Sequence, residues 1–174
     1  MPSRAESCNH RKVFLVAREL TLLFHFLGFG LLMTTVVAGL IINGQYRKAA
    51  DLQSKATILR TMRPIGLLSP LGILIMLITG IGNMHALGVG LFTLGWLSVK
   101  IMFFAIAAIS GIIFGIQSKE RGALVGRMAA GNAPANAEKL LKAYDKQAAL
   151  FYIVMPILML IILWLSVYGR LGGQ

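Results

Sequence analysis

One histidine stands inside a long apolar segment near the start of the chain. His25 lies in the middle of LLFHFLGFGLL, residues 22–32, where all the other residues are apolar. An imidazole in such a segment either forms a hydrogen bond to a neighbouring helix or takes part in ligand or proton chemistry, because an unpaired polar group in hydrocarbon is costly. Both alternatives predict that His25 faces other protein segments and not lipid.

The residues around His25 repeat at helical spacing. At about 100° per residue, one face of a helix collects Arg18, Thr21, His25, Gly28, Leu32, Val36 and Gly39. Glycine on such a face lets a second helix or a flat ligand approach closely. We therefore expect this face to point into a helix bundle, with Arg18, His25 and Gly28 as candidate binding residues.

A second polar face belongs to a later apolar segment. One side of a helix there collects Trp96, Lys100, Phe103, Ala107, Ser110, Gly111 and Phe114. Lys100 is the only charged residue of this face and lies about one turn inside the segment. Its ammonium group either reaches the interface along its own apolar stem or serves a site within the bundle. The second interpretation makes Lys100 a candidate catalytic residue.

The composition indicates the medium in which these faces fold. Of the 174 residues, 57% are hydrophobic and 13% are charged, and the mean hydropathy is +0.76, far from the values of a soluble domain. Helices of roughly 20 apolar residues cross about 30 Å of hydrocarbon. The sequence predicts an all-α membrane protein, a single domain over 1–174 built as an up-down bundle of four transmembrane helices at about 19–43, 64–82, 96–116 and 148–168.

Basic residues are distributed unequally between the two sides of this bundle. The segments 43–63 and 117–147 carry eleven of the 17 Lys and Arg residues, and the opposite side carries five. By the positive-inside rule, these two segments are predicted to be cytoplasmic and both termini to lie outside, in a cell inner membrane. The net charge of +11 then reflects topology and anionic lipid headgroups, and no nucleic-acid partner is expected.

Both basic segments are rich in residues that favour helices. The segment QYRKAADLQSKATILRTMRP contains no glycine, so the first helix is expected to continue into the cytoplasm until Arg63 and Pro64 redirect the chain. Asn136 is expected to cap a helix that runs on into the fourth transmembrane segment. Two of the helices should therefore extend beyond the bilayer on the basic side.

The order of these features resembles a known group of membrane proteins. The features are His25 in the first segment, Pro70 to Thr79-Gly80 in the second, and GWLSVK at the start of the third. They are similar to the small membrane-type protoporphyrinogen oxidases, the copper-resistance D-type proteins and related uncharacterised membrane families, over most of residues 19–168. The resemblance implies a haem b with His25 as the iron ligand and Lys100 as a catalytic residue nearby; Arg18 and Gly28, on the same helix face as His25, are then expected to contact this cofactor.

Two functions from different classes follow. The first is a haem b-binding membrane redox protein that oxidises a tetrapyrrole and passes electrons to quinone, since imidazole binds iron and the cation of Lys100 could pair with a porphyrin propionate. The second is a non-catalytic structural or assembly subunit of a larger respiratory or photosynthetic membrane complex, indicated by the small soluble parts and the glycine-lined helix faces. The expected partners are the lipid bilayer and either further copies of the chain or such a complex. Ion transport is disfavoured, because no helix carries paired histidines or a Met-x-x-Met spacing.

Overall fold

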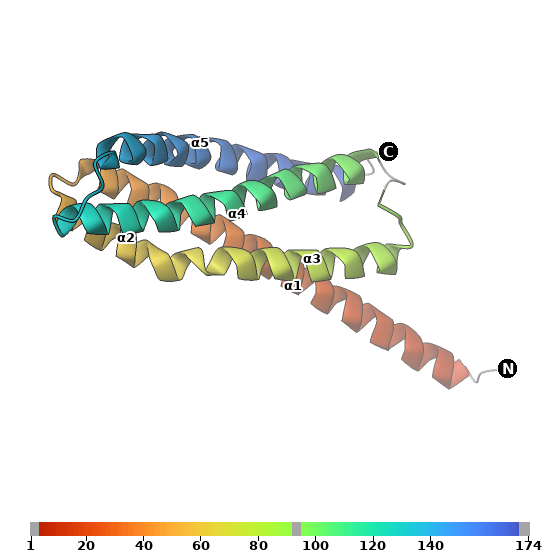
Figure 1. Cartoon of the computed structure of the whole chain (residues 1–174). Helices are drawn as coiled ribbons and strands as arrows, with labels where there is room; N and C mark the ends of the chain where they lie inside the picture. Colours follow the sequence, from red (N-terminus) through yellow and green to blue (C-terminus); the bar gives the residue numbers. More distant parts are fainter. Residues whose placement is uncertain (1–3, 92–94, 171–174) are drawn as a thin grey trace.

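The computed structural model of the chain is a bundle of helices. It describes residues 4–91 and 95–170, and in these residues it contains five helices (Figure 1). They are α1 (Arg4–Lys48), α2 (Leu52–Gly66), α3 (Leu68–Leu87), α4 (Gly95–Ala129) and α5 (Ala137–Arg170). Four helical stretches in them are long and apolar enough to cross a membrane, with α2 and α3 forming one such stretch. The predicted all-α bundle of four transmembrane helices is therefore confirmed.

The first basic segment differs from the prediction. The first helix does not continue to Arg63, because α1 ends at Lys48 and the chain reverses before α2 begins at Leu52. Asp51 is the physical reason: its carboxylate accepts a hydrogen bond from the Ser54 N–H at 2.8 Å and another from the Ser54 hydroxyl at 2.7 Å. Such a cap satisfies an N–H group that a new helix leaves unpaired, so it starts a helix at this point.

The hydrogen bonds of this cap also lower the pKa of the Asp51 carboxyl group. The backbone N–H of Ser54, followed by the Ser54 hydroxyl, holds the pKa of Asp51 below its ordinary value. The Asp51 carboxylate is therefore charged at neutral pH, at the end of α2 that carries the positive pole of the helix dipole. The chain then passes through Pro64 within the last turn of α2 and enters α3 after Leu67.

The second basic segment folds as predicted. The helix α5 begins at Ala137, directly after Asn136, and runs without interruption into the fourth apolar stretch. The backbone carbonyl of Asn136 accepts the N–H of Leu140 at 3.1 Å, so the helical hydrogen bonds of α5 begin at this residue. Pro156 lies within α5 without ending it.

The helices form two antiparallel pairs that α2 connects. In one pair α1 packs against α3, and in the other α4 packs against α5. Contacts between α1 and α5, and between α2 and both α1 and α4, join the pairs, whereas α3 and α4 touch only slightly. In Figure 1, α3 and α4 diverge toward the end of the molecule where α1 begins and α5 ends.

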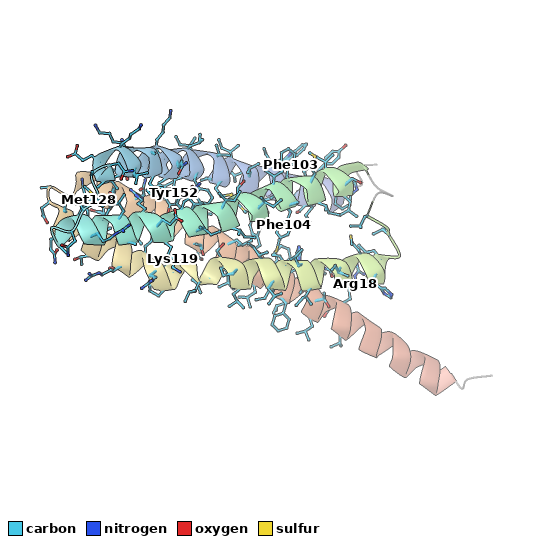
Figure 2. All side chains as sticks on the ribbon, viewed as in Figure 1. Arg18, Phe103, Phe104, Lys119, Met128 and Tyr152 are labelled. Atoms are coloured by element: carbon cyan, nitrogen blue, oxygen red, sulfur yellow. The ribbon has the colours of Figure 1, made fainter. Side chains whose placement is uncertain are left out.

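The two ends of the bundle differ in charge. One end, called the basic end below, consists of the last turns of α1, helix α2, the last turns of α4 and the first turns of α5. It carries all eleven basic residues of the segments 43–63 and 117–147. The opposite end, called the terminal end, contains the start of α1, the last turns of α3, the first turns of α4 and the last turns of α5. Figure 2 shows Met128 at the basic end and Arg18 toward the terminal end.

Two glycines let the backbones of α1 and α3 meet. A methyl group at Gly72 would lie 2.9 Å from the carbonyl oxygen of Gly28 and 3.0 Å from Cγ of Leu32. A methyl group at Gly28 would in turn lie 3.0 Å from side-chain atoms of Ile75 and Met76. Apolar helices do not associate through the hydrophobic effect within lipid, so such close packing decides which helices pair.

The face of α1 predicted to point into the bundle does so. Gly28, Leu32, Val36 and Gly39 are buried, Thr21 and His25 are partly buried, and Arg18 is exposed. The intervening residues of α1, such as Leu23 and Leu27, present their side chains outward, as lipid-facing residues would.

Replacement of Gly28 by valine should weaken the bundle. The Gly28→Val side chain has no space against α3, and we expect a loss of about 1–3 kcal/mol in the free energy of unfolding, as for other overpacked sites. Gly30→Val is the matched control, because a methyl group at Gly30 meets no atom within 4 Å. Unfolding in mixed detergent micelles, followed by circular dichroism, measures both variants. Equal stability of the two variants would contradict the close α1–α3 contact.

Candidate functional site

His25 joins α1 to α3. Its Nδ1 lies 2.8 Å from Oγ1 of Thr79. The Thr79 hydroxyl donates its one proton to the carbonyl of Ile75 at 2.6 Å, so it accepts a hydrogen bond from His25. This arrangement assigns the imidazole proton to Nδ1. The structure thus shows the interhelical hydrogen bond that was one of the two alternatives for this histidine.

The residues predicted to surround a haem are not brought together. The space beside Gly28 is filled by Gly72, Ile75 and Met76 of α3. Arg18 is exposed. Lys100 belongs to α4, which pairs with α5, whereas His25 and Gly28 belong to the α1–α3 pair.

A haem ring could not lie against Gly28 without displacing α3 from this glycine. The ring would have to occupy the space in which α1 and α3 are already in contact, at Gly28. We derive no chemical step from a haem at His25.

A large cavity lies elsewhere in the bundle. It has a volume of about 880 Å³ and separates α2 and α3 from α4, with residues of α1 and α5 at its base. Small-molecule sites in proteins commonly measure about 300–1,000 Å³. Neither His25 nor Lys100 lines this cavity. Figure 2 shows Phe104 and Lys119, which both line it, at different levels along α4.

The wall that α4 contributes combines small residues with larger side chains such as those of Phe104, Ile112 and Ile116. Small residues recur along it every three or four positions, at Gly111, Gly115, Ser118, Gly122 and Gly126. A methyl group at Gly115, Gly122 or Gly126 would meet no atom within 4 Å. These glycines therefore differ from Gly28 and Gly72, since they face open space where the other two face a helix.

Aromatic side chains form the base of the cavity. The rings of Phe114 and Phe151 are stacked, with centroids 3.8 Å apart, and Tyr152 meets both rings edge-on. The Tyr152 ring occupies the space that Gly39 leaves on α1, and its hydroxyl lies 3.6 Å from the Met62 sulfur. An apolar molecule in the cavity would thus contact a rigid aromatic surface.

The cavity is positively charged at one end. Arg60 and Arg63 of α2 and Lys119 of α4 line it at the basic end, and all three are exposed. No acidic side chain of the described residues lines the cavity. An apolar interior with a cationic rim suits a molecule that has an apolar body and an anionic end.

A buried arginine connects three helices at the basic end. Arg121 of α4 forms an ion pair with Asp145 of α5, with Nη2 2.7 Å from Oδ1, and donates from Nη1 to the Asn43 side chain of α1 at 3.2 Å. Its guanidinium carbon lies 3.9 Å from the ring centroid of Tyr46. In the sequence, Arg121 stands out only as one of the charges that set the topology. Its pairing with an aspartate 24 residues later cannot be inferred before the α4–α5 pairing is known.

The chain was compared with protein-family models, with curated proteins and with solved structures, and none of the three comparisons found a match. The resemblance to the protoporphyrinogen oxidase group therefore rests on the motifs around His25, Pro70 and Lys100 alone.

The His25–Thr79 bond should contribute measurably to stability. His25→Ala and Thr79→Val should each lower the free energy of unfolding by about 0.6–2 kcal/mol, the range of interhelical hydrogen bonds in membranes. The double variant should lose less than the sum of the two, because both changes remove the same bond. Thr34→Val, at an exposed position of α1, is the control and should be neutral.

The same variants decide between the bond and an iron ligand. If His25 only joins helices, the absorption spectrum of protein purified from haem-supplied cells is the same for the wild type and for His25→Ala. Soret absorbance that His25→Ala abolishes while the bundle stays folded would instead establish His25 as a haem ligand.

Proposed function

We propose that the protein is an integral membrane binding protein for molecules with an apolar body and an anionic end. The observation that supports this proposal is the cavity between α2–α3 and α4, which combines a glycine wall, an aromatic base and a cationic rim. The ligand body lies along α4, and its carboxylate or phosphate meets Arg60, Arg63 and Lys119.

The slight contact between α3 and α4 supports entry from the side. A ligand dissolved in the bilayer can reach the cavity between these helices without crossing a packed interface. The cations lie at the basic end, where the predicted apolar stretches finish. An anionic group would meet them at the membrane surface while its apolar body stays in hydrocarbon, which avoids the cost of burying a charge.

Tetrapyrroles belong to this ligand class. A porphyrin has a flat apolar ring and two propionates, and the glycine wall of α4 and the stacked Phe114 and Phe151 provide flat surfaces for such a ring. The haem b and the tetrapyrrole chemistry predicted from the sequence are retained in this form, with the cavity and not His25 as the binding site. Acyl lipids with a carboxylate or phosphate also combine an apolar body with an anionic end, and are the second candidate ligand.

Filling the cavity should abolish binding. The double variant Gly115→Leu, Gly122→Leu places two side chains in the open space, whereas Gly30→Leu adds one on the outer side of α1. We expect protoporphyrin IX to quench the tryptophan fluorescence of the purified wild type and of Gly30→Leu, and the double variant to bind at least about tenfold more weakly, a difference of about 1.4 kcal/mol. The same affinity in all three proteins would contradict the proposal.

The cationic rim should confer a preference for acids. Wild-type protein should bind protoporphyrin IX more tightly than its dimethyl ester, and palmitic acid more tightly than hexadecanol. This preference should be lost when Arg60, Arg63 and Lys119 are all replaced by Gln, and kept when the exposed Arg127, Lys139 and Lys142 are replaced in the same way. Comparison of the porphyrin pair with the acyl pair shows whether the ligand is a tetrapyrrole or an acyl lipid. If neither pair binds and a second polypeptide is purified in fixed ratio, the structural-subunit hypothesis is favoured instead.

The proposed orientation places the basic end in the cytoplasm and both termini outside, in the inner membrane. Asn132, exposed in the connection between α4 and α5, offers a test. In a Cys8→Ser background, Asn132→Cys should react with a membrane-impermeant maleimide only after the cells are broken. Labelling of Asn132→Cys in intact spheroplasts would show that the basic end lies outside the cell, which contradicts the proposed orientation.

A further inference from the structure

A second cavity opens at the basic end, apart from the larger cavity beside α4. It has a volume of about 330 Å³ and is lined by Asn43 and Arg47 of α1, Arg121 of α4, and Asp145, Lys146 and Ala149 of α5. None of these residues lines the larger cavity. Its position between α1 and α5 places it away from the entrance between α3 and α4.

The charge of this second cavity favours an anion. Three cations and one carboxylate line it, which leaves two positive charges in excess. Asp145 is already paired with the buried Arg121, whose Nε and Nη2 both bond to Oδ1 of the aspartate. The excess charge therefore resides on Arg47 and Lys146, which are exposed.

The pairing of Arg121 also fixes the shape of the cavity. Its bonds to Asp145 and Asn43 hold α1, α4 and α5 together at this level, so the helix segments that carry Arg47 and Lys146 are already in place before any ligand arrives. A site prepared in this way loses less entropy on binding than one that must be assembled around its ligand.

The surroundings point to a lipid. The cavity lies where the apolar stretches of α1 and α5 finish, near residues 43 and 148. One helical turn toward the hydrocarbon from Asn43 lies Leu40, and one turn from Lys146 lies Leu150, and both are exposed. A phosphate in the cavity would therefore have acyl-binding surface directly beside it.

We infer that this cavity binds the phosphate of an anionic phospholipid, with Arg47 and Lys146 as the groups that contact it. The lipid would lie against α1 and α5, with its acyl chains over Leu40 and Leu150. Basic pockets between transmembrane helices are known to hold anionic headgroups in this manner. The inference does not depend on the function proposed for the larger cavity.

Native mass spectrometry of delipidated protein tests the inference. Protein in detergent micelles is offered phosphatidylglycerol or phosphatidylcholine, and the bound lipid is counted. The wild type should retain one phosphatidylglycerol with at least tenfold preference, and Arg47→Gln, Lys146→Gln should lose that preference. The control Lys48→Gln, Lys142→Gln removes the same charge from exposed positions of the same helices that lie outside the cavity, and it should behave as the wild type.

A charge-preserving variant and a competition with free phosphate complete the test. Arg47→Lys, Lys146→Arg keeps the charges and should keep the preference, which separates loss of binding from loss of folding. Inorganic phosphate at the lipid concentration should not displace the lipid. Equal loss in the control pair would overturn the site, and displacement by inorganic phosphate would overturn its assignment to a lipid.

Discussion

The contact between α1 and α3 at Gly28 and Gly72 is the constraint on which the arrangement depends. In lipid, apolar helices gain little from meeting one another, so the pair that can approach most closely is the pair that forms. Here the carbonyl of Gly28 lies where a side chain at Gly72 would stand. Gly115, Gly122 and Gly126 of α4 have no such partner, and the space beside them forms part of the larger cavity.

Polar groups strengthen this arrangement at two levels. His25 and Thr79 connect α1 with α3 within the apolar part of the bundle, and Arg121 connects α1, α4 and α5 at the basic end. Both form hydrogen bonds to other helices, and His25 thereby satisfies its imidazole within the apolar part of the bundle. The surfaces that can bind a ligand are therefore the two cavities, each of which has exposed cations at its edge, Arg60, Arg63 and Lys119 in the larger and Arg47 and Lys146 in the smaller.

The sequence predicted the features that depend on one helix at a time. The four apolar stretches, the buried face from Thr21 to Gly39 and the start of α5 after Asn136 all follow from local periodicity and capping. The same kind of signal, Asp51 three residues before Ser54, marks the start of α2, and the prediction of one continuous helix, made from the absence of glycine, did not include it. The cavity and the Arg121–Asp145 pair depend on which helices become neighbours, and the glycines of α1 and α4 look alike until that pairing is known.

The most direct test of the account is to identify what occupies the larger cavity in the native membrane. A benzophenone amino acid at position 112, whose isoleucine lines the cavity and is exposed, can be cross-linked by light before extraction, with position 113 as an exposed control outside it. The account predicts that position 112, and not 113, yields an adduct with a small acidic amphipathic molecule by mass spectrometry. A cross-link from position 112 to another polypeptide would contradict it.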